Sequence, residues 1–269
     1  MMVKKKHMMY LLTVLSMGIG LACKKVVKVD LNDAPSRVVI EGEITNGPGP
    51  YHIKISRSVP FSDDNVFPPV SGAQVQVTDS NNGILYSYDE ISPGWYVCNF
   101  TGVVKHTYQL SVMADGQQYT ATSTMPLAVP LDSVTFAVNT DFNGKKEINA
   151  VVNFQDPPGL GNYYQFIEYL NGRQIPDIFV FEDRLSDGRY IEQPLFNDSA
   201  YLQKKDTMLL KMYCIDKPVY EYFFSLYQIT ANEGGVQSAS PANPNTNITG
   251  GALGYFSAHT IRQEKLVVY

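Results

Sequence analysis

Residues 37–57 read Arg-Val-Val-Ile-Glu-Gly-Glu-Ile-Thr-Asn-Gly-Pro-Gly-Pro-Tyr-His-Ile-Lys-Ile-Ser-Arg, and this stretch decides the fold class. Its apolar side chains recur at every second position, as expected of strands with one buried face. Between the two alternating runs lie the glycines and prolines of residues 46–50, which favour a tight turn. The stretch therefore predicts two strands joined by a turn.

The same alternation continues through the first half of the chain. Further runs of this kind cover Ala73–Val77, Tyr96–Phe100, Tyr108–Val112 and Tyr119–Ser123. Turn sequences such as Asn-Gly, Pro-Gly and Asp-Gly separate them, with no helical pattern in between. Short strands with frequent turns predict a β-sandwich domain over residues 36–126.

The second half reads as another β-rich domain, over residues 132–269. A linker is expected at residues 127–131, because the prolines around it interrupt any strand ladder. Strands are expected at residues 148–154, 163–170, 178–181 and 207–215, and again from Gly250 to the C-terminus. The fold class is therefore mainly β, with a sandwich followed by a second β-rich domain that carries one helix.

That helix is expected near residues 217–232. Asp216 can cap it, Pro218 suits its first turn, and Gly234-Gly235 can end it. An aromatic stripe at helical spacing lies between these signals, and we interpret it as core packing: Tyr220, Phe223, Phe224 and Tyr227.

The composition excludes some classes of function. Hydrophobic residues make up 44% of the chain and charged residues 17%, which indicates a globular body rather than a disordered one. The net charge of −5 argues against nucleic acid as a partner, since binding to phosphates needs clustered lysine and arginine.

The N-terminus predicts export. Three lysines, Lys4 to Lys6, precede an apolar run from Met8 to Leu21, the layout of a signal peptide over residues 1–22. Cys23 directly follows the small residue Ala22, so we expect a diacylglyceryl thioether there and a lipidated tether over residues 23–35. The alternative is an ordinary signal peptide with Cys23 placed by chance. Two or three acyl chains would anchor the protein firmly to a membrane.

Cys98 and Cys214 allow two interpretations. In an oxidising compartment they could form a disulfide, but a buried free thiol in an apolar strand is equally ordinary.

No catalytic, cofactor or metal motif is found in the sequence. His52, His106 and His259 stand apart from one another, and no metalloprotease, nucleophile-elbow or phosphate-loop pattern is present. Glu182, Asp183 and Asp187 form a small acidic cluster that could bind Ca²⁺ weakly, although solvated loop charge is the simpler interpretation. We therefore predict no catalytic, cofactor-binding or metal-binding residues.

Three Asp-Ser/Thr-apolar triplets form a different pattern. It is similar to the O-glycosylation acceptor of Bacteroidetes envelope proteins, and its hydroxyl residues are Ser133, Ser199 and Thr207.

Several segments together resemble a family of Bacteroidetes lipoproteins, domain-of-unknown-function family 4249. The residues that carry the resemblance are Val38 to Gly42, Gly49 to Ser56, Pro69 to Ala73 and, most specifically, Asn247 to Phe256. The resemblance covers almost the whole mature chain and transfers no functional residues.

The N-terminal half also looks like the transthyretin-like sandwich of carboxypeptidase regulatory domains, on Ser71 to Val75 and Gly94 to Tyr96. Similar proteins lie in the outer membrane of bacteria that use TonB-dependent receptors. The resemblance implies an outer-membrane lipoprotein, on the periplasmic or the cell-surface face, as a non-enzymatic accessory or binding component of a TonB-dependent uptake system.

Tyr163, Tyr164 and Tyr169 are then candidates for a contact surface, unless they belong to the core of the sheet. Two alternative functions stay open at this point. One is a glycan-directed hydrolase with paired carboxylates, and the other is a structural or adhesive surface module.

Overall fold

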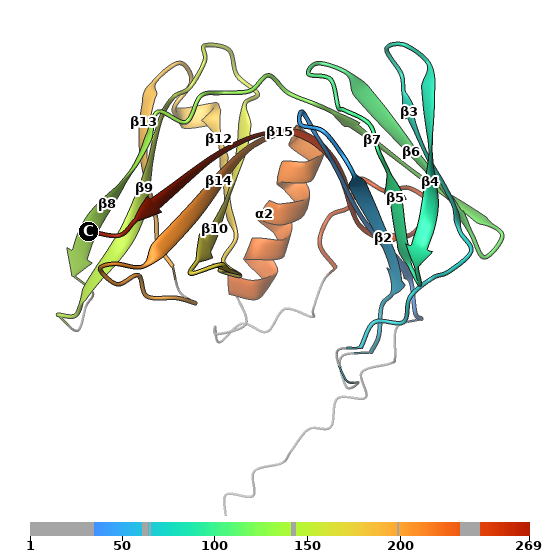
Figure 1. Ribbon diagram of the computed structural model, residues 1–269, viewed down its shortest axis with the longest axis horizontal. Coiled ribbons are helices and arrows are strands. Elements are labelled where there is room, and N and C mark those ends of the chain that lie inside the picture. The colour runs from blue at the N-terminus through green and yellow to red at the C-terminus, as the bar shows by residue number, and fades with distance from the viewer. Residues whose placement is uncertain (1–34, 61–63, 65, 141–143, 198, 232–242) are drawn as a thin grey trace, which may run out of the picture. The chain divides into compact units, whose positions relative to one another are not determined.

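The computed structural model describes residues 35–60, 64, 66–140, 144–197, 199–231 and 243–269 (Figure 1). The expected signal peptide, Cys23 and all but the last residue of the tether therefore lie outside the described residues. So do the glycines expected to end the helix, Gly234-Gly235.

The first half of the chain contributes seven strands that enclose one core. They are β1 (Val38–Thr45), β2 (Tyr51–Arg57), β3 (Gln74–Asp79), β4 (Ile84–Ser92), β5 (Trp95–Cys98), β6 (Thr107–Ala114) and β7 (Gln117–Thr124). They are hydrogen-bonded in the order β1-β2-β5-β4-β3-β6-β7, and a bridge from Ala121 to Ile248 links β7 to the C-terminal segment. Their alternate side chains form the first hydrophobic cluster together with Ile248, Ala252, Phe256 and Ala258 of the C-terminal segment.

This arrangement confirms the mainly β fold class and the strands expected in this half. The structure adds β4, a strand that the sequence did not predict. Only Tyr88 of its nine residues is buried. A strand that is exposed on most of its length gives little periodic signal to read.

The second half is built from two sheets around a second hydrophobic cluster. β8 (Ser133–Thr140), β9 (Lys146–Gln155) and β13 (Tyr190–Leu195) form a three-stranded sheet in the order β13-β9-β8. β10 (Tyr163–Leu170), β11 (Arg173–Gln174), β12 (Phe179–Glu182) and β14 (Thr207–Ile215) extend the larger sheet. Apolar residues of both sheets, among them Val152, Phe166 and Leu210, pack together between them.

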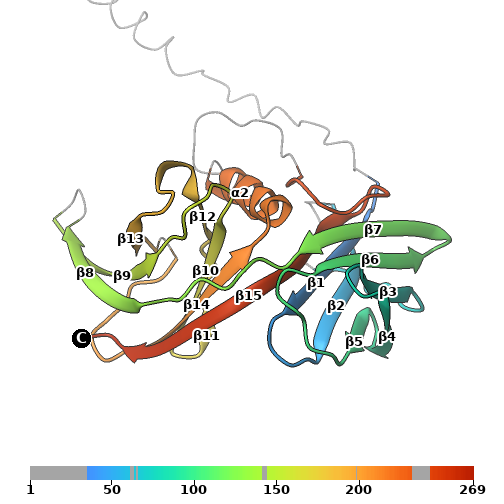
Figure 2. The same cartoon turned by 90° about the horizontal axis from the view of Figure 1, so that it is seen from above.

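One long strand, β15 (Leu253–Val267), belongs to both halves (Figures 1 and 2). Its first part runs parallel to β1, with Leu253–His259 opposite Val39–Thr45. Its second part is antiparallel to β14, with Thr260–Val267 opposite Thr207–Cys214. The last strand of the sequence thus joins the two hydrophobic clusters through one continuous ladder.

The C-terminal glycines permit this close packing. Gly254 has a φ of +94°, and a Cβ atom there would lie 2.0 Å from the Ile40 carbonyl oxygen. Gly250 has a φ of +81°, and its Cβ would lie 2.7 Å from the Gln118 oxygen. Only glycine fits positions with both a positive φ and a backbone neighbour this close.

The single α-helix of the described residues is α2 (Lys217–Ala231), and it begins where the sequence predicts. The Asp216 carboxylate accepts the Val219 amide at 3.3 Å, which caps the first turn. It also accepts the Ser123 hydroxyl at 2.8 Å and the Thr124 amide at 2.9 Å, so the cap ties α2 to β7. Burial raises the pKa of this carboxyl, and these hydrogen bonds act against that shift.

The aromatic stripe of α2 is only partly core. Tyr220 is buried against the third hydrophobic cluster with Tyr213, Ile215 and Val219, and Phe223 packs beside them. Phe224 and Tyr227 remain 39% and 47% exposed, so the core-packing interpretation is wrong for these two residues. The helix instead buries Tyr222, which lies off the expected stripe and contacts β15.

Cys98 and Cys214 are both free thiols in this structure. Burial raises the pKa of each, and the Cys214 sulfur also accepts the Val129 amide at 3.3 Å. Within the described ranges, no helix is both long enough and apolar enough to span a membrane.

Candidate functional site

A row of four side chains crosses the outer face of the first half's sheet. Register places Tyr255 of β15 beside Glu41 of β1, Glu41 beside Lys54 of β2, and Lys54 beside Trp95 of β5. Side chains opposite each other on one face of a sheet are close enough to interact directly. The hairpin of β1 and β2, together with β5 and the C-terminal β15, therefore presents one continuous polar and aromatic row.

This row forms the floor of an open groove with a volume of ≈ 410 Å³. Its lining also includes Glu43 and Thr45 of β1, Tyr51 and His52 of β2, and Pro50 from the turn between these strands. The volume lies within the range of about 300–1,000 Å³ that is usual for small-molecule sites. We call this hollow the β1–β15 groove.

Contacts within the groove hold its charged side chains in place. Lys54 Nζ lies 3.2 Å from Glu41 Oε2, and the Tyr255 hydroxyl donates to Glu43 Oε1 at 2.7 Å. Trp95 is 43% exposed, with the Lys54 ammonium 5.9 Å from the centroid of its ring. The His52 ring meets the indole edge-on, at 6.3 Å between centroids. The groove thus offers an exposed indole beside two fixed carboxylates and an ammonium.

Helix α2 supports the groove on the β15 side. The Tyr255 ring packs against Tyr222 at 4.9 Å and against Phe223 at 4.8 Å between centroids. Burial, reinforced by Glu43, raises the pKa of Tyr255 well above its usual value, and burial beside Glu41 raises that of Tyr222 to about 12. Both phenols stay protonated at physiological pH, so Tyr255 can donate its hydrogen bond to Glu43.

Two histidines that stand apart in the sequence have partners in the structure. His106 Nδ1 lies 2.7 Å from Asp79 Oδ2, and Asp79 is fully buried. A carboxylate beside an imidazole is part of the serine and cysteine hydrolase arrangement, which also needs a nucleophile. No hydroxyl or thiol of the described residues is hydrogen-bonded to the other ring nitrogen of His106.

His259 makes the second pair, 2.9 Å from the Ser257 hydroxyl. Its ring is stacked on Tyr213 at 4.2 Å between centroids and is only 1% exposed. Burial lowers the pKa of His259, so the imidazole is held neutral. A serine and histidine sealed beneath the surface cannot reach a substrate, so we assign this pair to packing.

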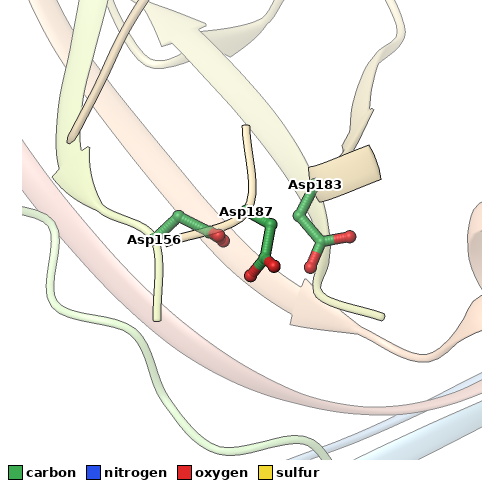
Figure 3. Close-up of side chains that lie close together, drawn as sticks. All are labelled: Asp156, Asp183 and Asp187. Atoms are coloured by element: carbon green, nitrogen blue, oxygen red, sulfur yellow. The ribbon is translucent and has the colours of Figure 1, made fainter. Parts of the chain in front are cut away.

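The structure contains the acidic cluster that the sequence predicted, but with one different residue. Asp183 and Asp187 meet Asp156, the residue after β9, with carboxylate oxygens within 4.8 Å of one another (Figure 3). Glu182, which the sequence grouped with them, is instead paired with Arg184 at 2.8 Å. Asp156 was missed because it lies 27 residues before Asp183, beyond any local motif.

Each carboxylate of this cluster already holds part of the loop backbone. Asp183 accepts the amides of Gly161 and Asn162 at 2.9 Å, Asp187 accepts that of Gly159 at 2.6 Å, and Asp156 accepts that of Gly188 at 3.0 Å. Three oxygen ligands could contact a hard cation, but Ca²⁺ takes six to eight. The loop hydrogen bonds account for the cluster without a metal.

The three candidate contact tyrosines are distributed between core and surface. Tyr164 is 2% exposed, and its hydroxyl donates to Asp156, so this residue belongs to the core. Tyr163 is partly buried and packs 5.1 Å from Tyr220 of α2. Tyr169 is also partly buried, with the Lys211 ammonium 5.0 Å from its ring centroid. They do not form one exposed tyrosine surface.

The predicted O-glycosylation residues differ in accessibility. Ser199 is exposed, but its hydroxyl donates to Asp177 at 2.6 Å. Ser133 and Thr207 are partly buried at the first positions of β8 and β14. Asp198, which precedes Ser199, lies outside the described residues, and modification at all three positions stays a prediction.

Sequence reasoning did not find the β1–β15 groove. One residue in the sequence could have indicated the groove. Trp95 is the only tryptophan of the chain, and it lies at an outward position next to a turn. In the sequence, the charges of Glu41, Glu43 and Lys54 are typical of the solvent-exposed face of two strands. Only the pairing of β1 with β15 brings Tyr255 to them.

Fold and site define the class as a β-rich protein with an open polar groove on one sheet. A family model described as "Domain of unknown function (DUF4249)" matches residues 24–265, and the chain belongs to this family. A comparison with curated proteins finds no match.

Proposed function

We propose that the protein is an exported lipoprotein of the bacterial cell envelope that binds a ligand without transforming it. In this proposal, lipid on Cys23 tethers it to the outer membrane, and it serves as an accessory of a TonB-dependent receptor. The likeness to Bacteroidetes lipoproteins and to transthyretin-like sandwiches supports this setting. The groove beside Trp95 is the observation that carries the binding role.

The chemistry of the groove favours binding over catalysis. Its lining includes no cysteine or serine, and the Thr45 hydroxyl already accepts the Gly47 amide at 3.2 Å. An activated nucleophile needs a base within hydrogen-bond reach. His259 lies opposite Thr45 in the register of β1 and β15, but its ring is buried and stacked on Tyr213. The ring of His52, in the lining, packs edge-on against Trp95. Preformed polar contacts on a rigid sheet suit recognition, because little ordering is needed when a ligand binds.

The anchor is tested first. Cells that express the tagged full-length protein are fed radiolabelled palmitate, alongside a Cys23→Ser variant. We expect label in the native protein and none in the variant, and an unlabelled native protein would contradict lipidation. A label that persists in the variant would place the lipid on another residue.

The receptor role needs the protein in its own membrane. The tagged lipoprotein is isolated from native envelopes in mild detergent, and the species that accompany it are identified and quantified. We expect a TonB-dependent receptor in about one-to-one ratio. A protein that is recovered alone from intact envelopes would contradict the accessory role and favour an adhesive or structural one.

One observation favours the alternative of a glycan-directed hydrolase. Glu41 and Glu43 both line the groove, on the same face of β1. Residues two apart in a strand are about 7 Å apart, and paired glycosidase carboxylates are ~5–10 Å apart. Release of reducing ends from oligosaccharides, lost in both Glu41→Gln and Glu43→Gln, would support hydrolysis. Binding without release supports the non-enzymatic function.

A further inference from the structure

We propose that the β1–β15 groove binds a neutral saccharide, with one sugar ring lying against Trp95 and its hydroxyl groups bonded to Glu41, Glu43 and Lys54. This assignment rests on the binding function proposed above and names its ligand class. Three properties of the groove support it: an aromatic platform, a mixed set of hydrogen-bonding groups, and a charge balance that disfavours other ligands.

The platform is the indole of Trp95. It is 43% exposed on an outward position of β5, although tryptophan is usually well buried. The edge-on His52 ring and the Lys54 ammonium limit its motion. A sugar ring has one face of C–H groups that needs apolar contact, and a fixed exposed indole supplies that contact at little entropic cost.

The rim around the indole supplies both acceptors and donors. An ionised carboxylate offers about four lone-pair positions, whereas Glu43 accepts one hydrogen bond, from Tyr255, and Glu41 one ion pair, from Lys54. The Lys54 ammonium carries three N–H donors, and its side chain is 38% exposed. Saccharide hydroxyls both donate and accept, so a vicinal pair can match a carboxylate and the ammonium together.

The charges of the lining disfavour the competing ligand classes. A phosphate or an acidic saccharide would meet Glu41 and Glu43 with only Lys54 to offset them. At Glu41 a cationic ligand would compete with Lys54, and the other carboxylate, Glu43, already accepts the Tyr255 hydroxyl. An apolar ligand would cover the Glu41–Lys54 pair and remove water from it without new hydrogen bonds, which costs free energy.

Trp95 also makes the proposal measurable, because it is the only tryptophan in the chain. Its fluorescence is recorded while the full mature protein is titrated with neutral hexasaccharides: maltohexaose, cellohexaose, xylohexaose, mannohexaose and chitohexaose. Matched probes are oligogalacturonate, pentalysine and inorganic phosphate. We expect at least one neutral hexasaccharide to change the emission saturably, with a dissociation constant below about 1 mM, and the charged probes to cause no saturable change.

Calorimetry on variants locates the site, because it measures binding without the fluorescence of Trp95. Trp95→Ala is expected to weaken saccharide binding about tenfold, and Trp95→Phe less, because a ring remains. Glu43→Gln is also expected to weaken binding about tenfold, since it loses a charged acceptor at constant shape. Glu192→Gln, on the exposed face of β13, is the matched control and leaves binding unchanged. Thermal unfolding verifies that each variant is folded.

The outcomes separate the ligand class from the binding function. Saturable binding of oligogalacturonate, pentalysine or phosphate, without any neutral hexasaccharide, overturns the saccharide assignment and leaves the binding function standing. Hexasaccharide binding that Trp95→Ala and Glu43→Gln leave intact overturns the location. If no probe binds and the protein is recovered alone from native envelopes, both the ligand class and the proposed function are overturned.

Discussion

The two halves of the chain treat their carboxylates in opposite ways. In the first half, Glu41 and Glu43 remain at the surface of the groove, and the buried Asp79 is paired with His106. In the second half, Glu168 of β10 is only 1% exposed and faces the second hydrophobic cluster without a hydrogen-bond partner for either oxygen. The carboxylates that line the groove are therefore available to a ligand, whereas the Glu168 carboxylate is sequestered from solvent.

The environment of Glu168 has a measurable consequence. Burial raises the pKa of this carboxyl to about 7, the charge of Asp177 adds to the shift, and the nearby amide of Asn197 opposes it. The nitrogen and the oxygen of the Asn197 side-chain amide are also buried, and neither has a hydrogen-bond partner among the described residues. Through Glu168, the stability of the second half therefore depends on pH.

The largest expected effect tests the strand that joins the halves. Gly254→Ala would place a Cβ 2.0 Å from the Ile40 oxygen at a φ of +94°, so we expect the free energy of unfolding to fall by about 4 kcal/mol or more. Gly251→Ala is the control, because its φ is +81° but its Cβ meets open space, and it should cost only about 1 kcal/mol. Denaturant unfolding measures both, and equal losses would contradict the close contact of β1 with β15.

Glu168→Gln comes next and acts on the second half. The pKa of this carboxyl is raised in the folded state from 4.5 to about 7, so its ionisation favours the unfolded chain. The stabilisation that this group contributes to the folded state is fully present below pH 4.5, and it is lost as the pH rises through about 7. The variant should therefore be more stable than the native protein at pH 8, by up to about 3 kcal/mol, with no gain at pH 4. Unfolding curves at several pH values measure this, and an unchanged pH profile would contradict the burial of Glu168.

A smaller effect is expected in the acidic loop cluster. Asp183→Ala removes the acceptor of the Gly161 and Asn162 amides from a site that is 3% exposed, so we expect a loss of about 2 kcal/mol. Relief of repulsion from Asp156 and Asp187 keeps the loss near this value. Asp187→Ala, at an exposed position, should cost less than about 1 kcal/mol. If thermal unfolding shows that Asp187→Ala is the more destabilising change, the greater contribution expected of the buried Asp183 is wrong.

The smallest effect is expected for the groove itself. Glu41→Gln breaks an ion pair whose side chains are 41% and 38% exposed, and such pairs contribute about 0–1 kcal/mol. We expect a change in the free energy of unfolding of less than about 0.5 kcal/mol, together with weaker ligand binding. A loss above about 2 kcal/mol would show that the pair is structural, and the contrast with the second half would disappear.

Much of the fold could be predicted from local pattern. The alternation in β1, β2, β6 and β7 and the capping of α2 by Asp216 are properties of short segments, so they are visible without tertiary information. β4 and the exposed residues Phe224 and Tyr227 escaped prediction because periodicity reports spacing, while exposure depends on what lies opposite.

The site could not be predicted in this way. The groove depends on Glu41 and Tyr255, which are 214 positions apart in the sequence and become neighbours only when β15 pairs with β1. The histidine–aspartate pair and the third carboxylate of the acidic cluster depend on contacts between separate strands or loops in the same manner.

The mainly β class, the alternating strands and the start of the helix could be predicted from the sequence alone. These follow from backbone sterics and from the period of side chains along one strand. Only the tertiary structure decided which charges are exposed around Trp95 and which are buried around Glu168. The register between distant strands sets the neighbours of each side chain, and those neighbours fix its solvation and its charge.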